Sequence, residues 1–222
     1  MKLLKNEWLQ LLILVLPFCA ALLLWDSLPD RMPIHWNARG EIDGYAGKAF
    51  ATLFLPLLNV ALAAIFFLVS AIDPKVLRSQ PDVRASFHRM FRIVRLSITA
   101  FLSLVALAVI VSTVGVPLDI PRTIVIGFAL LFGILGNFMG KIRPNYFVGI
   151  RTPWTLESKD VWVRTHRLAA RLMVAVSIIT VAAGFLVPVS ALVWIISAVF
   201  MLFFLLTFAY SFFIYKQQNP AS

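Results

Sequence analysis

The segment from residue 26 to 49 gathers side chains that could bind a ligand or a metal ion. It holds an imidazole, two aromatic rings, an amide and a carboxylate, in His35, Trp36, Asn37, Asp43 and Tyr45. Prolines restrict the approach to this segment while Gly40 and Gly44 tolerate turn conformations, so we expect a shaped loop. A metal site made from His35, Glu41 and Asp43 matches no established ligand spacing. The loop is therefore predicted to be either a structural lid or an exposed recognition surface.

The segment from residue 140 to 167 holds the second set of candidate residues. Thr152 before Pro153 has the form of a helix N-cap followed by proline at the first helical position. Ser158 with Asp160 predicts a second helix start that runs on into an apolar segment. We expect this motif to organise neighbouring helix ends. Its candidate residues are Asn145, Gly149, Arg151, Thr152, Pro153, Trp154, Trp162, Thr165, His166 and Arg167.

Two basic stripes flank these segments. Arg84, His88, Arg92 and Arg95 form one stripe by helical spacing, and Arg164, Arg167 and Arg171 form the other. Such stripes are typical of contacts with anionic phospholipid headgroups at a membrane surface. Docking of an acidic protein partner is the alternative. Direct nucleic-acid binding is not expected, because the positive charge follows the membrane topology described below.

Long apolar segments must position these residues. The chain has 222 residues, 61% of them hydrophobic and 14% charged, with a mean hydropathy of +0.91. A soluble domain has far more charge, and a transmembrane β-barrel would alternate apolar and polar residues. We therefore predict an all-α integral membrane protein, folded as a single polytopic domain over residues 1–222. Its six predicted spans are residues 8–25, 50–72, 96–114, 123–139, 168–187 and 191–215.

The distribution of lysine and arginine predicts the orientation. With the N-terminus in the cytoplasm, sixteen of the 20 basic residues fall on the cytoplasmic side and four outside. Both termini and the loops at 73–95 and 140–167 are then cytoplasmic, and the loop at 26–49 is outside. The first apolar segment is expected to remain as a helix, because no small-residue cleavage site follows it. The chain is therefore predicted to be a multi-pass membrane protein.

The interior of the spans argues against transport and catalysis. The sequence places no ionisable residue near the centre of a span, where an ion-coupled transporter needs one. His35 lies on the side opposite His88 and His166, and the single Cys19 permits no internal disulfide or cysteine metal site, so we expect neither an enzyme nor a cofactor. Small residues at Ala129, Gly133, Gly136 and Gly140 predict close helix packing within the chain, with a homodimer as the alternative.

Two motifs resemble those of a known family. The first comprises residues 33–37 with Gly40, Glu41 and 43–45; the second comprises 141–145 and 149–156 with Trp162 and 165–167. Both are similar to the signature regions of the SdpI family, bacterial membrane immunity proteins against the sporulation-delaying-protein toxin. The resemblance implies a multi-pass protein of the bacterial plasma membrane that gives resistance to a secreted membrane-active peptide. It also implies sensing of that peptide and docking of a transcriptional repressor at the membrane. A small-molecule or peptide transporter and a structural, lipid-organising protein are the alternatives.

Overall fold

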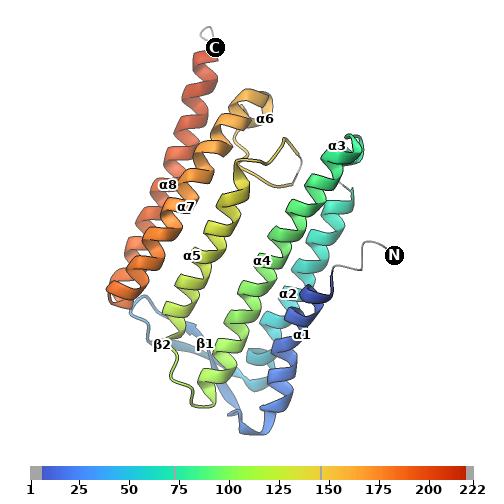
Figure 1. The fold of residues 1–222 in the computed structure, drawn as a ribbon. Coiled ribbons are helices and arrows are strands. Elements are labelled where there is room, and N and C mark those ends of the chain that lie inside the picture. The colour runs from blue at the N-terminus through green and yellow to red at the C-terminus, as the bar shows by residue number, and fades with distance from the viewer. Residues whose placement is uncertain (1–6, 73, 146, 219–222) are drawn as a thin grey trace.

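Helices dominate the computed structural model, which describes residues 7–72, 74–145 and 147–218. The chain ends, residue 73 and residue 146, which belong to the predicted cytoplasmic regions, lie outside the described residues. The long helices alternate in direction along the chain (Figure 1). The helices are α1 (Trp8–Leu23), α2 (Lys48–Ile72), α3 (Pro74–Leu77), α4 (Pro81–Thr113), α5 (Ile120–Met139), α6 (Pro153–Glu157), α7 (Lys159–Leu186) and α8 (Val189–Gln218), with a 3₁₀ turn η2 (Trp25–Ser27).

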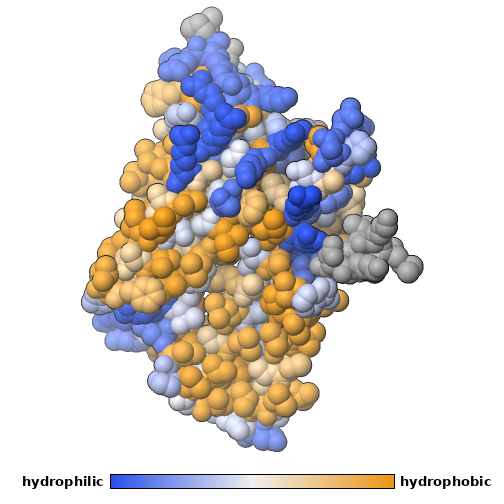
Figure 2. All heavy atoms as spheres, viewed as in Figure 1, coloured by the Kyte–Doolittle hydropathy of each residue, from blue (hydrophilic) through white to orange (hydrophobic). Residues whose placement is uncertain are grey.

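Five of the six predicted spans correspond to helices long and apolar enough to cross a membrane, namely α2, α4, α5, α7 and α8. Helix α1 has 16 residues, which gives a length of about 24 Å at 1.5 Å per residue. That is shorter than a hydrocarbon core of roughly 30 Å. The predicted span at residues 8–25, which contains α1, and the orientation of the termini therefore stay predictions. Figure 2 shows hydrophobic side chains over the middle of the molecule and hydrophilic ones gathered at the end that carries α3 and α6.

The predicted helix starts near the second motif are confirmed. The Thr152 side chain accepts a hydrogen bond from the backbone N–H of Thr155 at the start of α6. The Ser158 side chain accepts one from Val161 N, 3.3 Å away, at the start of α7. Helices α4 and α7 begin well before the predicted spans, because the basic stripes themselves are helical and continue into the apolar segments.

A small antiparallel sheet is an addition to the predicted all-α fold. Strands β1 (Arg31–Trp36) and β2 (Ile42–Gly47) pair with Arg31 opposite Gly47 and Trp36 opposite Ile42, and the register shifts around His35. The turn between them closes where Gly40 N donates to the carbonyl of Asn37, 2.9 Å away. The predicted shaped loop is thus a β-hairpin, which we call the hairpin (residues 31–47). It lies at the end of the molecule opposite α6 (Figure 1).

The long helices form two groups of three. Helices α1, α2 and α4 pack together, as do α5, α7 and α8, and the two groups meet mainly through α4 and α5. The tightest contact is between α5 and α7. An ideal Cβ atom added at Gly136 would lie 2.6 Å from the Cβ of Met173 on α7, and one at Gly140 would lie 3.3 Å from the Cβ of Ala170. The small-residue stripe therefore serves packing within one chain, as predicted.

A buried polar network joins α1, α2 and α4. Its members are Glu7, Gln10, Asn59, Arg95, Thr99 and Ser103. Arg95, only 6% exposed, pairs with Glu7 and donates to Gln10 Oε1 over 2.7 Å. Asn59 Nδ2 donates to Ser103 Oγ over 3.0 Å. The sequence placed Arg95 at the edge of a span, whereas the extended α4 brings it into the helix interface.

The α5–α7 contact yields the first testable prediction. We expect Gly136→Ala to lower the free energy of unfolding in detergent by about 1–3 kcal/mol, because the added methyl group overlaps Met173. Gly47→Ala is the matched control, since no atom lies within 4 Å of an ideal Cβ at Gly47. Equal stability of the two variants would contradict the close approach of α5 and α7.

Candidate functional site

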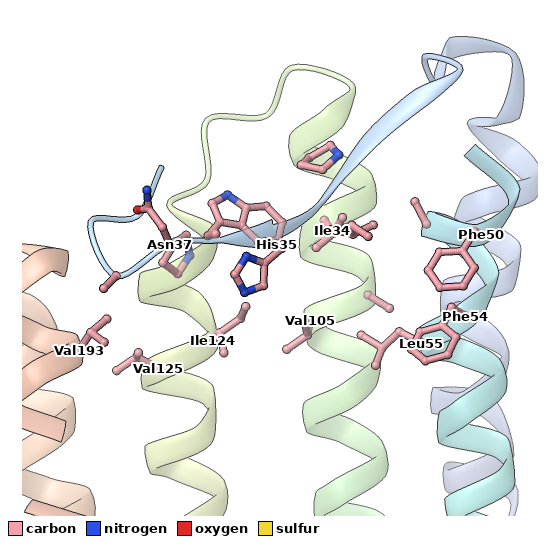
Figure 3. Close-up of a pocket in the computed structure, with 17 residues that line it drawn as sticks. Ile34, His35, Asn37, Phe50, Phe54, Leu55, Val105, Ile124, Val125 and Val193 are labelled. Atoms are coloured by element: carbon pink, nitrogen blue, oxygen red, sulfur yellow. The ribbon is translucent and has the colours of Figure 1, made fainter. Parts of the chain in front are cut away.

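The hairpin connects the two helix groups at one end of the molecule. Met32 is completely buried and packs with Ala21, Leu28 and Ile110 of the first group and its connection. At the other end of the hairpin, an ideal Cβ at Gly40 would lie 3.1 Å from Val189 Cγ1 at the start of α8. The hairpin therefore extends from α1 across to α8, over the ends of α4 and α5 (Figure 3).

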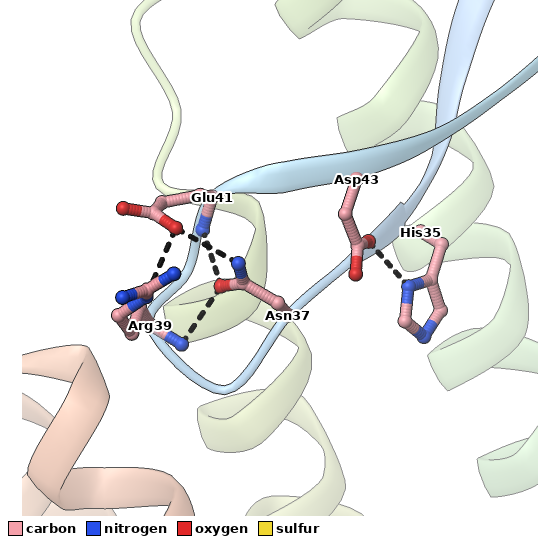
Figure 4. Close-up of polar contacts among 5 residues, drawn as sticks. All are labelled: His35, Asn37, Arg39, Glu41 and Asp43. Carbon is pink, nitrogen blue, oxygen red and sulfur yellow. Dashed lines mark hydrogen bonds and ion pairs between the residues drawn. The ribbon is translucent and has the colours of Figure 1, made fainter.

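Two sets of polar contacts shape the hairpin (Figure 4). His35 Nδ1 donates to Asp43 Oδ1 across the strands, at 2.5 Å. Near the turn, Asn37 Nδ2 donates to Glu41 Oε2 over 2.8 Å and Arg39 Nε donates to the same oxygen over 3.1 Å. The Asn37 hydrogen bond, together with the positive charge of Arg39, lowers the pKa of Glu41 below its ordinary value. The turn thus keeps an ionised carboxylate in place at the surface.

An apolar cavity of about 780 Å³ lies beneath the hairpin. Side chains of α2, α4, α5 and α8 form its walls, among them Phe54, Val105, Val109, Ile124 and Val193. His35, Trp36 and Asn37 of the hairpin line the same cavity. Figure 3 shows His35 and Asn37 at its hairpin side. The cavity therefore combines a wide apolar surface with a few polar groups on one side, which is the usual composition of a ligand pocket.

The structure brings most of the predicted outer residues to this cavity. His35, Trp36 and Asn37 line it, and Asp43 and Gly44 contact or oppose His35 across the hairpin. Gly40 contacts α8, as described above. Tyr45 does not line the cavity and is 52% exposed.

Sequence reasoning missed the apolar walls of the cavity. Val105, Val109, Ile124 and Val193 are residues that any membrane helix carries, so their types gave no signal. In the part of the chain that the structure describes, no three His, Cys, Asp or Glu side chains gather as a metal site would require.

The second motif lies at the opposite end of the molecule, where it forms a loop between α5 and α6. Asn145 organises the loop, because its Oδ1 accepts from Phe147 N and Val148 N while its Nδ2 donates to Val148 O. Arg151 donates to the carbonyl of Asn145 over 3.0 Å. These bonds give the loop a defined shape from its own side chains.

His166 attaches this loop to α7. Its Nε2 accepts from Ile150 N over 2.9 Å, and its Nδ1 lies 2.8 Å from the carbonyl of Trp162. This pair of bonds requires a neutral imidazole with the proton on Nδ1. Gly149, at φ +129°, passes so close that an ideal Cβ would lie 2.5 Å from His166 Nε2. Only glycine suits both the backbone angle and the space.

The remaining residues of the motif join α6 to α8 or face outward. Thr152 Oγ1 donates to Ser211 Oγ of α8 over 3.0 Å, and the Trp154 ring contacts Phe208 and Phe212 of α8. Trp162 Nε1 donates to the carbonyl of Ile142, and Thr165 is buried. The exposed members are Arg151, Pro153 and Arg167. These contacts join the loop and α6 to α7 and α8.

Comparisons with known proteins cover both sites. Residues 141–211 match the family model described as the SdpI/YfhL protein family, and residues 12–60 match a model described as a domain of unknown function, DUF1648. The chain is 22% identical over 215 residues to the immunity protein SdpI of Bacillus subtilis (strain 168), covering 97% of this chain and 98% of that protein. The C-terminal third of the chain is thus similar to the SdpI/YfhL family, and the whole chain is similar to one immunity protein. No solved structure matches it.

The two family matches divide the molecule as the two sites do. The DUF1648 match contains most of α1, the hairpin and the first half of α2, and so includes the polar side of the cavity. The SdpI/YfhL match begins at Lys141 and contains the second motif with α6, α7 and most of α8. Both SdpI-family motifs identified in the sequence therefore correspond to folded features at opposite ends of the molecule. The family is one of membrane proteins and not of enzymes.

Two buried threonines of the second motif offer a matched test of stability. Thr152→Val removes the N-cap of α6 and the bond to Ser211, so we expect the free energy of unfolding to fall by about 0.5–2 kcal/mol. Thr165→Val should be neutral or slightly stabilising, because the buried Thr165 hydroxyl has no hydrogen-bond partner. Chemical denaturation of both variants in the same detergent measures the difference. A larger loss for Thr165→Val would refute this assignment of roles.

Proposed function

We propose that this chain is an immunity protein of the bacterial plasma membrane, protecting its cell from a secreted, membrane-active peptide. The observation that carries the proposal is the similarity to an immunity protein over 97% of the chain. The hairpin and its cavity supply a recognition site for such a peptide. The alternating directions of the helices and the basic residues at the α6 end support an orientation with the hairpin outside and both termini in the cytoplasm.

In this proposal the cavity binds an apolar segment of the peptide. Burial of a Leu or Phe side chain contributes about 1.5–3 kcal/mol relative to water. A bilayer offers the same peptide a similar gain, so apolar burial alone would not retain it in the protein. Selectivity then comes from groups that lipid tails lack, namely His35 with its Asp43 partner, Trp36 and Asn37 along the hairpin side of the cavity. A peptide held there is kept from disordering the membrane.

The second motif is proposed to serve the response inside the cell. Its exposed members Arg151 and Arg167 are positively charged, which suits an acidic surface of a docked transcriptional repressor. Sensing requires that occupation of the cavity alters this face. The contact of Val148 with Phe87 and Phe91 of α4 supports such a link, because α4 also forms a wall of the cavity.

Filling the cavity tests its role in immunity. We expect Val109→Trp to reduce survival of toxin-challenged sensitive cells at least tenfold relative to the unmodified protein, because the indole occupies space that the peptide needs. Ile178→Trp is the control, since Ile178 is 64% exposed on α7 and does not line the cavity. Membrane levels of both variants are measured by immunoblot. Full protection by well-expressed Val109→Trp would refute recognition in this cavity.

The proposed orientation has its own test. In a Cys19→Ala background, a membrane-impermeant maleimide should label Tyr45→Cys in intact cells, because Tyr45 is exposed on the hairpin. Arg167→Cys should be labelled only after the membrane is opened. Labelling of both positions in intact cells would place the two motifs in one compartment and overturn the sensing scheme.

A further inference from the structure

A second cavity lies between α2 and α4, toward the α6 end of the molecule and remote from the hairpin. Its volume is about 310 Å³. Aromatic residues of both helices form part of its wall, and the hydroxyl of Ser70 borders it. The lining residues are Glu7, Phe66, Phe67, Ser70, Ala85, His88, Arg89, Phe91, Arg92 and Arg95. The cavity thus presents three arginines beside a single carboxylate.

The charges in this cavity are unbalanced. The one acidic side chain, Glu7, already pairs with the buried Arg95, which also bonds to Gln10 and lies over the Phe67 ring. Neither Arg89 nor Arg92 forms an ion pair with any residue that the structure describes. Their spacing of three places them as neighbours on one face of α4. The two guanidinium groups therefore retain their donors for an anion.

An apolar surface adjoins the arginines of the cavity, as in a lipid-binding site. Helix α2 supplies an apolar flank at the cavity itself, because Phe66 and Phe67 line it and Phe67 is 38% exposed. An acyl chain can lie along this flank while the phosphate of the same molecule reaches the arginines. A soluble phosphate would make no use of the apolar flank. Arginine is also the residue best suited to phosphate, because its planar donors bind two oxygens at once.

We infer that this cavity binds the phosphate of one anionic phospholipid, with Arg89 and Arg92 as donors and the α2 flank as the acyl-chain surface. The Glu7–Arg95 pair closes the protein side of the cavity and fixes its shape. The bound lipid contacts both α2 and α4 and so adds to their packing. This is a defined site for one headgroup, in contrast to the diffuse attraction of a basic surface for an anionic leaflet.

Native mass spectrometry of the purified full-length protein tests the site. The probe is phosphatidylglycerol added to protein in a neutral detergent. We expect one phosphatidylglycerol to remain bound, and Arg89→Gln with Arg92→Gln to weaken its apparent affinity at least tenfold. Arg164→Gln with Arg171→Gln is the control pair, which removes the same charge from exposed positions of α7 and should leave that affinity unchanged.

Competition identifies the source of the phosphate. Neither inorganic phosphate nor zwitterionic phosphatidylcholine, at ten times the phosphatidylglycerol concentration, should displace the bound lipid. Displacement by inorganic phosphate would overturn the lipid assignment, and an equal loss in the two double variants would overturn the site. Thermal unfolding of each variant without added lipid shows whether the variant is folded. The double variant Arg89→Lys with Arg92→Lys keeps the positive charge and should retain part of the affinity for phosphatidylglycerol. Suppose that the Arg89→Gln, Arg92→Gln variant loses binding but also unfolds at a lower temperature, and that the Arg89→Lys, Arg92→Lys variant binds as weakly. That result would count against the proposal.

Discussion

Two groups of helices must be held together in a solvent that does little to press them against each other. Lipid tails are as apolar as the helix surfaces, so burial of apolar side chains between helices gains little in a membrane. Within each group, close backbone contact and polar side chains supply the attraction, as at Gly136 of α5 and Arg95 of α4. Among the helices that the structure describes, the extensive contact between the groups is that of α4 with α5. The hairpin and the second motif, at the two ends of the molecule, therefore contribute more to holding the groups together than their short lengths suggest.

At one end the hairpin acts as a tie between the groups, with Met32 buried on the first group and Gly40 against Val189 of the second. At the other end Val148 of the second motif packs on Phe87 and Phe91 of α4. The cavity under the hairpin is lined by α2 and α4 from one group and by α5 and α8 from the other. The peptide that we propose as its ligand would contact both groups, so its affinity would depend on their relative position. The same relative position sets the contact of Val148 with α4.

Features governed by short sequence spacing could be predicted, and those governed by distant partners could not. Thr152 and Ser158 cap helices through bonds to residues three positions on, so their roles follow from the local sequence. By contrast, Arg95 finds Gln10 and Glu7 at separations of 85 and 88 residues.

The hairpin was foreseen only as a shaped loop. Pro33 interrupts the strand pattern, and the register shifts beside His35, so the alternation that marks a regular strand is weak. The position of the second motif relative to α4 depends on packing that no local pattern reveals.

A resemblance in sequence marks all residues of that motif alike, but the structure separates them. Trp162 donates to the carbonyl of Ile142, and His166 accepts from the amide of Ile150. Neither side chain then has a polar atom left to bind a partner. Arg167 is exposed and bound to no acid that the structure describes. A change at His166 would therefore affect a docked protein only through the shape of the loop, whereas a change at Arg167 would act on the surface charge itself.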